Sequence, residues 1–349
     1  MGQALNKLLK FYDYHLPKDL IALKPAHPRD SARLLIYHKR ANKIRFDKFY
    51  NLGKYLPKNS VLVFNQTKVL PARLILKKST GGKVAVLYID HDAKHIKVIA
   101  NRKLKTSDHV FFHGRGKTHG FKIVKKIGQF YFLKPNFPVS KIENVLRRYG
   151  QTPLPPYLKH SPLTEKQRRL EYQSIFARAG LSVAAPTASL HFTKNLIARL
   201  RKQGIEIKFV QLDVNLGTFA PLKPENLTSG KLHSEQYSID KKTAADLNQA
   251  KEKGRPIIAV GTTVARTLEA AAQGHRLKKL SGQTRLFIRP GYKFKIVDGL
   301  ITNFHVPKSS LMMLVATLLD RKKLINIYKT AIKKGFRFFS FGDGMLTLP

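Results

Sequence analysis

Apolar and polar residues follow three different patterns along the chain. Residues 33–37 and 60–64 have the composition of short strands, and the polar run 65–68 interrupts this pattern. A series of short apolar segments then lies between Gly and Lys residues, at 84–89, 96–100, 110–113, 121–126 and 130–133. Several short strands at such close spacing predict a small β-barrel.

After residue 172 the pattern changes to alternating strands and helices. Residues 195–203 predict a helix that ends at Gly204 and is followed by a strand at 205–210. A strand at 256–260 leads into a helix at 264–273, which also ends at a glycine. This order of elements predicts an α/β layout.

Residues 152–157 separate the two patterns. Three of these six residues are prolines without an amide donor, so the segment cannot form a central strand and marks a domain boundary. The glycine-rich run at 114–120 has some likeness to a dinucleotide-binding loop. Strand-like residues follow it where such a loop needs a helix, so it predicts a hairpin turn.

Composition narrows the class of protein. A chain of 349 residues with 43% hydrophobic and 10% aromatic residues can fold into two domains. No stretch reaches the roughly 18 apolar residues of a membrane span, and residues 1–10 lack a signal-peptide core, so we expect a cytoplasmic protein without membrane contact. The absence of cysteine excludes disulfides, thiolate metal sites, iron–sulfur radical chemistry and cysteine nucleophiles.

The charge points to a polyanionic partner. The formal net charge is +44, from 65 Lys and Arg against 21 Asp and Glu, and the excess is spread along the chain. Residues 72–155 alone contain 18 basic and 4 acidic residues, a difference of +14. Such an excess favours nucleic acid binding, but a generally basic proteome in an acid- or salt-adapted host would give the same composition.

Two runs of small and hydroxyl residues precede helices. Residues 182–193 end in His191, a candidate acid or base, and in Thr193, a suitable N-cap; a capped helix with a packed histidine is the alternative. Residues 261–269 directly follow an apolar strand, and the amides of such a helix start suit a carboxylate or phosphate. Simple N-capping by a threonine of this run is the alternative there.

Two further runs carry polar groups near the C-terminus. Residues 302–310 contain His305 and precede an apolar helix at 311–319, an arrangement that can form the wall of an active site. Residues 338–344 place Asp343 on a turn between glycines, where an Asx-turn is the alternative explanation.

These runs resemble, in one order along nearly the whole chain, the S-adenosylmethionine:tRNA ribosyltransferase-isomerases of queuosine biosynthesis. In the first half of the chain, the matching segments are 13–17, 28–31, 63–73, 81–84, 153–157 and 171–173. The later ones are 182–193, 216–219, 233–235, 261–269, 290–292, 303–310 and 337–345.

The resemblance implies the fold and the reaction. The expected fold is a larger α/β domain of residues 1–73 and 152–349 with a small β-barrel domain, residues 74–151, inserted into it. This agrees with the changes of pattern near residues 74 and 152. The expected reaction transfers and isomerises the ribosyl part of S-adenosylmethionine, a co-substrate, onto 7-aminomethyl-7-deazaguanine at the tRNA wobble position. Epoxyqueuosine-tRNA, adenine and methionine are the products, and neither a metal nor an obligate protein partner is expected.

The reaction needs a base that removes a proton beside the sulfonium and an acid that helps adenine to leave. The catalytic candidates are His191, His305, Glu235 and Asp343. The candidates for contact with S-adenosylmethionine are Thr187, Thr193, Thr262, Thr263, Arg266 and Asn303. The candidates for RNA contact are Arg29, Arg33 and Arg73.

The chain departs from the family pattern at several positions. Asp213 and Asn215 stand where members commonly have His and Gly, and Leu181 and Ser189 stand where glycine is usual. Two other functions fit the composition. A basic RNA-binding relative without catalysis would bind tRNA without releasing adenine. An ordinary methyltransferase would release S-adenosylhomocysteine, but the chain lacks a glycine-rich loop between a strand and a helix.

Overall fold

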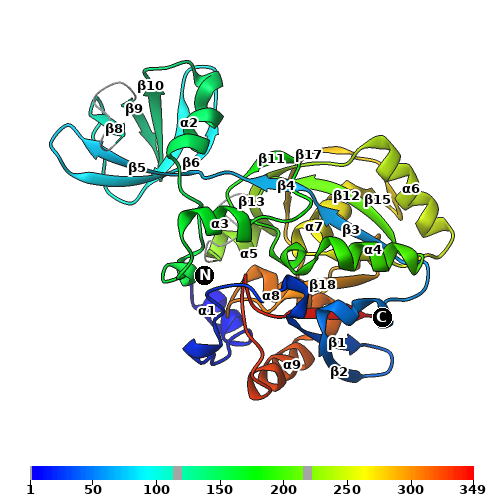
Figure 1. The fold of residues 1–349 in the computed structure, drawn as a ribbon. Helices are drawn as coiled ribbons and strands as arrows, with labels where there is room; N and C mark the ends of the chain where they lie inside the picture. Colours follow the sequence, from blue (N-terminus) through cyan, green and yellow to red (C-terminus); the bar gives the residue numbers. More distant parts are fainter. Residues whose placement is uncertain (1, 113–119, 215–221) are drawn as a thin grey trace.

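The computed structural model describes residues 2–112, 120–214 and 222–349. The chain forms a large α/β domain and a separate closed β-barrel, as the sequence predicts (Figure 1). The predicted hairpin turn at 114–120 lies, except for Gly120, outside the described residues, as do Asn215 and residues 216–219 of the family resemblance.

A mixed sheet forms the centre of the α/β domain. Its strand order is β17-β13-β12-β3-β14-β18-β19-β1-β2. The pairs β12/β3, β3/β14, β14/β18 and β1/β19 are parallel, and the remaining neighbours are antiparallel. The strands are β1 (Arg33–His38), β2 (Lys43–Lys48), β3 (Val61–Asn65), β12 (Glu206–Leu212), β13 (Lys231–Ser238), β14 (Ile257–Val260), β17 (Ser281–Leu286), β18 (Gly299–Asn303) and β19 (Gly344–Leu348).

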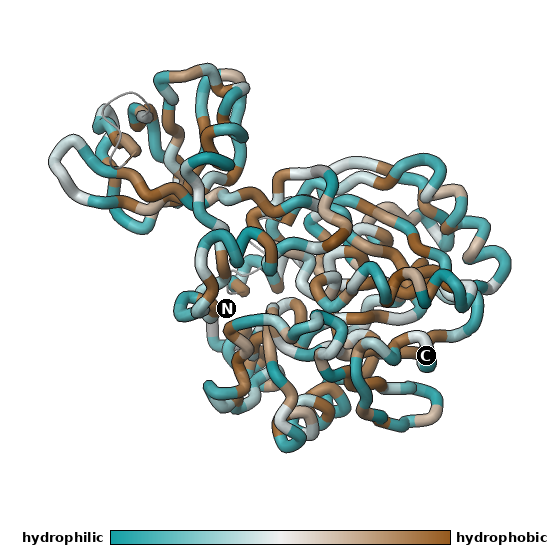
Figure 2. The backbone as a smooth tube through the Cα atoms, in the orientation of Figure 1, coloured by the Kyte–Doolittle hydropathy of each residue, from teal (hydrophilic) through white to brown (hydrophobic). Residues whose placement is uncertain are grey.

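Both faces of this sheet are buried. In β3, Val61 and Val63 belong to one hydrophobic core, whereas Leu62 and Phe64 belong to a second core on the opposite face. This explains why the central strands are continuous apolar runs in the sequence. In Figure 2 many residues of the central strands are brown, which marks hydrophobic residues. Much of the outer helices and loops is teal, which marks hydrophilic residues. The helices of this domain are α1 (Gly2–Lys10), α3 (Glu165–Glu171), α4 (Lys194–Lys202), α5 (Pro224–Ser229), α6 (Lys241–Glu252), α7 (Thr262–Ala271), α8 (Ser310–Leu319) and α9 (Arg321–Lys333).

Two small strand pairs complete this domain. The strands β4 (Thr67–Val69) and β11 (Ala179–Ser182) pair in parallel, and β15 (Ala272–Gln273) pairs with β16 (Arg276–Leu277). The polar run 65–68 therefore does not simply interrupt the strand pattern. The Asn65 side chain donates to the Leu212 carbonyl, 2.9 Å away, and accepts from the Thr67 amide at 3.1 Å, so it joins the end of β3 both to β12 and to β4.

The barrel has its own hydrophobic core. Its closed strand order is β10-β7-β6-β5-β8-β9, with all neighbours antiparallel. The strands are β5 (Arg73–Lys78), β6 (Lys83–His91), β7 (Ile96–Ala100), β8 (His109–Phe112), β9 (Gly120–Ile127) and β10 (Phe130–Pro135), and helix α2 (Ile142–Tyr149) follows them.

The chain enters and leaves the barrel at neighbouring positions. Arg73 and Gln151 form an isolated antiparallel bridge, with N–O distances of 3.1 and 2.7 Å. These residues lie beside the borders at 73/74 and 151/152, and we propose this division of the chain into domains. The barrel stands away from the α/β domain in Figure 1. None of the helices in the described parts of the chain has the length and apolar character needed to cross a membrane.

Candidate active site

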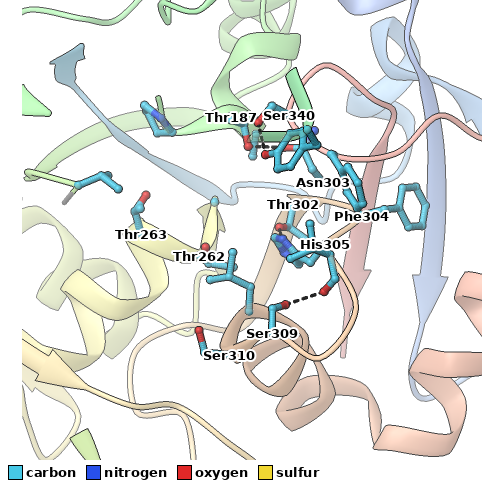
Figure 3. Close-up of a pocket in the computed structure, with 18 of the residues that line it drawn as sticks. Thr187, Thr262, Thr263, Thr302, Asn303, Phe304, His305, Ser309, Ser310 and Ser340 are labelled. Carbon is cyan, nitrogen blue, oxygen red and sulfur yellow. Dashed lines mark hydrogen bonds between the residues drawn. The ribbon is translucent and has the colours of Figure 1, made fainter. Parts of the chain in front are cut away.

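A cavity of about 500 Å³ opens at the carboxyl ends of β14 and β18. These two strands are parallel neighbours, with Val260 beside Ile301, so the segments that follow them meet at the same sheet edge. The start of α7 and residues 302–311 line the cavity, together with residues 185–188 from a distant part of the chain. Figure 3 shows Thr187, Thr262, Thr302 and His305 around this cavity. Ligands of α/β sheets commonly bind at such an edge.

The start of α7 is open towards a ligand. Its N-cap is Gly261, whose φ of +98° suits glycine and which provides no side-chain cap. The alternative of N-capping by Thr262 or Thr263 is therefore wrong. The first amides of the helix have no acceptor within it. The Thr263 hydroxyl is buried and has no hydrogen-bond partner among the described residues. Both threonines line the cavity, so a hydroxyl and helix amides are available to an anionic group.

His305 forms part of the opposite wall. Its Nε2 atom shares a 2.9 Å hydrogen bond with the Thr302 hydroxyl. Its amide donates to the Tyr328 hydroxyl, 3.0 Å away, and its carbonyl accepts from the Tyr14 hydroxyl. Burial lowers the pKa of His305 to about 4, so the imidazole is neutral near pH 7.

His191 lies behind the cavity wall. The Thr187 hydroxyl donates to Asn303 Oδ1 at 2.9 Å, and Asn303 Nδ2 donates to His191 Nε2 at 3.2 Å. Asn303 and Thr187 line the cavity, whereas His191 does not and is stacked on Phe49 with ring centroids 4.6 Å apart. Burial, followed by the charges of nearby arginines, lowers the pKa of His191 to about 3. His191 can therefore position Asn303, but it does not reach the cavity itself.

The rest of the wall is largely apolar and aromatic. It includes Ala185, Ala188, Phe304 and Phe339, and Asp and Glu are absent from the described lining residues. The Tyr157 hydroxyl forms a 2.7 Å hydrogen bond with the Ser340 hydroxyl. Burial raises the pKa of Tyr157 to about 12. The charged lining residue Lys308 forms an ion pair with Asp13, in which Lys308 Nζ is 2.8 Å from Asp13 Oδ2.

Glu235 and Arg266 form a buried ion pair beside this cavity. Both line a smaller cavity that shares Ser310 and Leu311 with the larger one. Arg266 Nε also donates to the Leu286 carbonyl at 3.1 Å, while its Nη2 has no partner among the described residues. The pair borders the main cavity without lining it, which suits positioning of the α7 start better than direct contact with substrate.

Two other site candidates have structural partners outside the cavity. The Thr193 hydroxyl caps α4 by accepting from the Leu196 amide at 3.1 Å, and it donates to Asp30 at 2.8 Å. The Asp343 carboxylate accepts from the backbone amides of Arg33 at 2.9 Å and Arg337 at 2.7 Å. Neither Thr193 nor Asp343 lines the cavity, so both stabilise the fold in this conformation.

The arginines expected to contact RNA differ in their surroundings. The Arg29 guanidinium donates to the carbonyls of Gln173 and Leu170 and pairs with Glu171 at 3.1 Å. The Arg33 guanidinium lies 3.9 Å above the Phe336 ring. Arg73 is exposed at the entrance to the barrel, and its guanidinium has no partner among the described residues. Arg73 is therefore the most available of the three.

Three positions that depart from the family pattern, Leu181, Ser189 and Asp213, lie among the described residues. Asp213 Oδ1 accepts from the Thr67 hydroxyl at 2.8 Å and from the Leu181 amide at 3.3 Å, so it joins β4 to β11. The Ser189 hydroxyl is buried without a partner among the described residues.

Sequence patterns did not indicate the role of Tyr157 in the cavity. Lys308 and Ser340 also line it, and they lie in the runs 302–310 and 338–344, although neither was a site candidate by itself. Tyr157 lies in the proline-rich boundary segment, and a tyrosine at a domain boundary is the signal that would have selected it. Clusters of His, Asp or Glu that could hold a metal ion do not occur among the described residues.

The fold is that of an α/β domain with a separate closed β-barrel, and its main cavity lies at the carboxyl ends of parallel strands. The family model of queuosine biosynthesis proteins matches residues 9–347, and the chain belongs to this family. The resemblance inferred from the motifs is confirmed.

Named relatives agree along nearly the full length. The chain is 43% identical to the S-adenosylmethionine:tRNA ribosyltransferase-isomerase of Carboxydothermus hydrogenoformans, over 97% of this chain and 99% of the relative. It is 41% identical to that of Fusobacterium nucleatum, over 98% and 97%. The crystal structure of the Thermotoga maritima S-adenosylmethionine tRNA ribosyltransferase matches with a TM-score of 0.56 and 30% identity, over 97% of this chain and 100% of that one. The predicted enzyme class is confirmed.

Proposed function

We propose that this enzyme transfers and isomerises the ribosyl part of S-adenosylmethionine onto 7-aminomethyl-7-deazaguanine at the wobble position of tRNA. The products are epoxyqueuosine-tRNA, adenine and methionine, and the reaction takes place in the cytoplasm. The relatives that match over nearly their whole length have names with the same co-substrate and the same class of RNA.

The observation that carries the proposal is the meeting of the α7 start with the end of β18. The α7 amides and the buried, unpaired Thr263 hydroxyl suit the methionine carboxylate of the co-substrate. The aromatic lining residues Tyr157, Phe304 and Phe339 suit the sulfonium and adenine, because aromatic rings attract cations and stack on bases. A cavity of about 500 Å³ is in the usual range for a ligand of this size.

His305 is the group best placed to accept a proton. The sulfonium acidifies the neighbouring carbon, and a neutral imidazole is needed to take the proton from it. The pKa of about 4 keeps His305 neutral at the working pH. When Nε2 carries the ring hydrogen and donates it to the Thr302 hydroxyl, Nδ1 is free to accept the proton.

Adenine leaves as a neutral base only when it takes up one proton, and the proton that His305 has removed from the carbon balances this uptake. His191 has a pKa of about 3 and accepts a hydrogen bond from Asn303. The Tyr157 hydroxyl keeps its proton because its pKa is about 12, and it lines the same cavity. We infer that Tyr157 donates a hydrogen bond to the leaving base, while His191 positions Asn303.

Product analysis tests the proposal. The enzyme is incubated with labelled S-adenosylmethionine and tRNA that carries the deazaguanine precursor. We expect adenine and methionine in amounts equal to the modified tRNA. A non-catalytic RNA-binding relative would bind the tRNA and release no adenine. An ordinary methyltransferase would release S-adenosylhomocysteine. Either of these outcomes would reject the proposed reaction.

A further inference from the structure

The outer surface of the barrel carries lysines among aromatic rings on the neighbouring strands β7, β10 and β9. Side chains alternate along β10: Tyr131 and Leu133 point into the barrel core, whereas Phe130 and Phe132 lie half-buried on the outside. We call Lys97, Lys125, Lys134, Phe130 and Phe132 the Lys–Phe platform.

The register of the strands brings these groups together. Phe132 lies opposite Lys97 on β7 and opposite Lys125 on β9. The Nζ atom of Lys97 is 4.2 Å from the centre of the Phe130 ring, and that of Lys125 is 4.9 Å from the centre of the Phe132 ring. Each aromatic ring therefore holds one ammonium group close to the surface of the sheet.

The platform lysines form no ion pair with the described residues. The sequences of β7, β9 and β10 contain no Asp or Glu. Asp90 on the adjacent strand β6 is in register with Lys97 but forms no ion pair with it, and its carboxylate accepts from the amide of His91 at 2.8 Å. The ion pairs formed by described residues include none with Lys97, Lys125 or Lys134.

An exposed lysine normally loses rotamer freedom when it binds a phosphate. An ammonium already held over a ring has less of that freedom to lose, so the rings prepare the lysines for an anionic partner. Ile127, opposite Phe130 and 57% exposed, adds an apolar contact to the same surface. Several ammonium groups on one surface, combined with exposed apolar surface, match the phosphodiester backbone and sugars of a nucleic acid.

We propose that the Lys–Phe platform binds the RNA backbone at a site outside the nucleotide that enters the cavity. The inference rests on the proposed function in that it takes this RNA to be the tRNA substrate. The barrel stands away from the α/β domain in Figure 1, so the platform contacts a part of the RNA other than the reacting base. Lys97 and Lys125 contact phosphates, and Phe130 and Phe132 are positioning residues.

A charge-matched pair of variants tests the platform. Lys97→Gln/Lys125→Gln removes two platform charges. Lys77→Gln/Lys83→Gln removes two exposed charges that face each other across β5 and β6, and β5 lies opposite β10 in the closed strand order. The binding of a tRNA transcript is measured by filter binding between about 0.05 and 0.3 M salt.

We expect the platform variant to bind roughly 25- to 60-fold more weakly at 0.1 M salt, with a salt slope smaller by roughly 1.4 to 1.8. The control variant should bind like the wild type. Equal binding by the two variants would overturn the proposal, because charge alone would then explain affinity. The proposal would also be overturned if the wild-type platform bound an acidic protein tightly while the platform variant bound tRNA as the wild type does.

A second variant tests the role of the rings. Phe130→Leu/Phe132→Leu keeps the apolar cover but removes the ring faces. We expect affinity to fall roughly 2- to 5-fold per ring while the salt slope stays the same, because the lysines still reach phosphate. Unchanged affinity would show that the rings do not position the lysines.

The readouts separate this inference from the proposed reaction. The platform variant should raise KM for tRNA and leave kcat unchanged, since its residues lie outside the cavity. Platform-dependent tRNA binding without adenine release would reject the reaction and keep the platform. Adenine release with wild-type KM for tRNA in the platform variant would reject the platform and keep the reaction.

Discussion

The α/β domain and the barrel use polar residues in opposite ways. The cavity of the α/β domain is lined by hydroxyls, amides, a neutral imidazole and aromatic rings, with Lys308 as its charged side chain among the described residues. Described lysines on the barrel strands are exposed or half-buried, and the sequence of residues 72–155, which includes the barrel, has an excess of 14 positive charges. From this difference we propose that the chemical step and the affinity for RNA reside in separate parts of the molecule. Each can therefore be removed while the other remains.

The largest expected effect comes from the proton acceptor in the cavity. His305→Ala should lower kcat by roughly 10²- to 10⁴-fold, because general base catalysis is lost. The Kd for tRNA and its salt dependence should stay unchanged, in contrast to Lys97→Gln/Lys125→Gln on the barrel. Single-turnover adenine release and filter binding measure the two quantities. Turnover of His305→Ala at the wild-type rate would remove His305 from the mechanism.

The buried histidines should also make the α/β domain sensitive to acid. The pKa values of His191 and His305 are lowered to about 3 and about 4, whereas a histidine of the unfolded chain titrates near 6.5. As the pH falls below about 6.5, the unfolded chain binds protons that the folded protein does not. The free energy of unfolding should therefore decrease as the pH falls, until the pH reaches the pKa values of the folded protein. At pH 5 each histidine should account for a loss of about 2 kcal/mol relative to neutral pH.

This effect is measured as a difference between variants. Urea unfolding at pH 7.5 and pH 5 is compared for the wild type, His191→Gln and His305→Gln. Each substitution should reduce the loss of unfolding free energy between the two pH values by about 2 kcal/mol, whatever it does to stability at pH 7.5. The same loss in all three proteins would show that neither histidine is held neutral by burial.

Local patterns predicted the parts of the fold that depend on neighbouring residues. The barrel strands, the junction from β14 to α7, and the N-cap at Thr193 all follow from periodicity and residue type within a few positions. The run 65–68 was misjudged because Asn65 uses its side chain to bond Leu212, which is 147 positions away.

The roles within the candidate site depend on contacts that no local pattern encodes. His191 lies behind Asn303, 112 positions later in the chain, and Asp343 accepts from the amide of Arg33, 310 positions earlier. The sequence therefore indicated which residues to consider. Tertiary packing decides that Thr262, Thr263, Asn303 and His305 line the cavity, whereas His191, Thr193 and Asp343 support it.

A smaller effect is expected at the anion end of the cavity. Thr263→Val should weaken binding of S-adenosylmethionine roughly 10- to 100-fold, because a hydrogen bond to a charged group is lost. The free protein should keep or gain stability, since the wild-type hydroxyl is buried without a partner among the described residues. Calorimetric titration and thermal unfolding measure the two effects. A stability loss comparable with the loss of binding would indicate a purely structural hydroxyl.

The smallest effect should distinguish arginines at the border between the two regions. Arg73 is exposed at the barrel entrance, so Arg73→Gln should weaken tRNA binding roughly 5- to 8-fold at 0.1 M salt by removing one phosphate contact. Arg29 already bonds Gln173, Leu170 and Glu171, so Arg29→Gln should lower the free energy of unfolding by about 1 to 3 kcal/mol without changing the salt slope. Filter binding and urea unfolding of both variants decide the assignment. If Arg29→Gln reduced the salt slope and Arg73→Gln did not, RNA would contact the α/β domain there and not the entrance to the barrel.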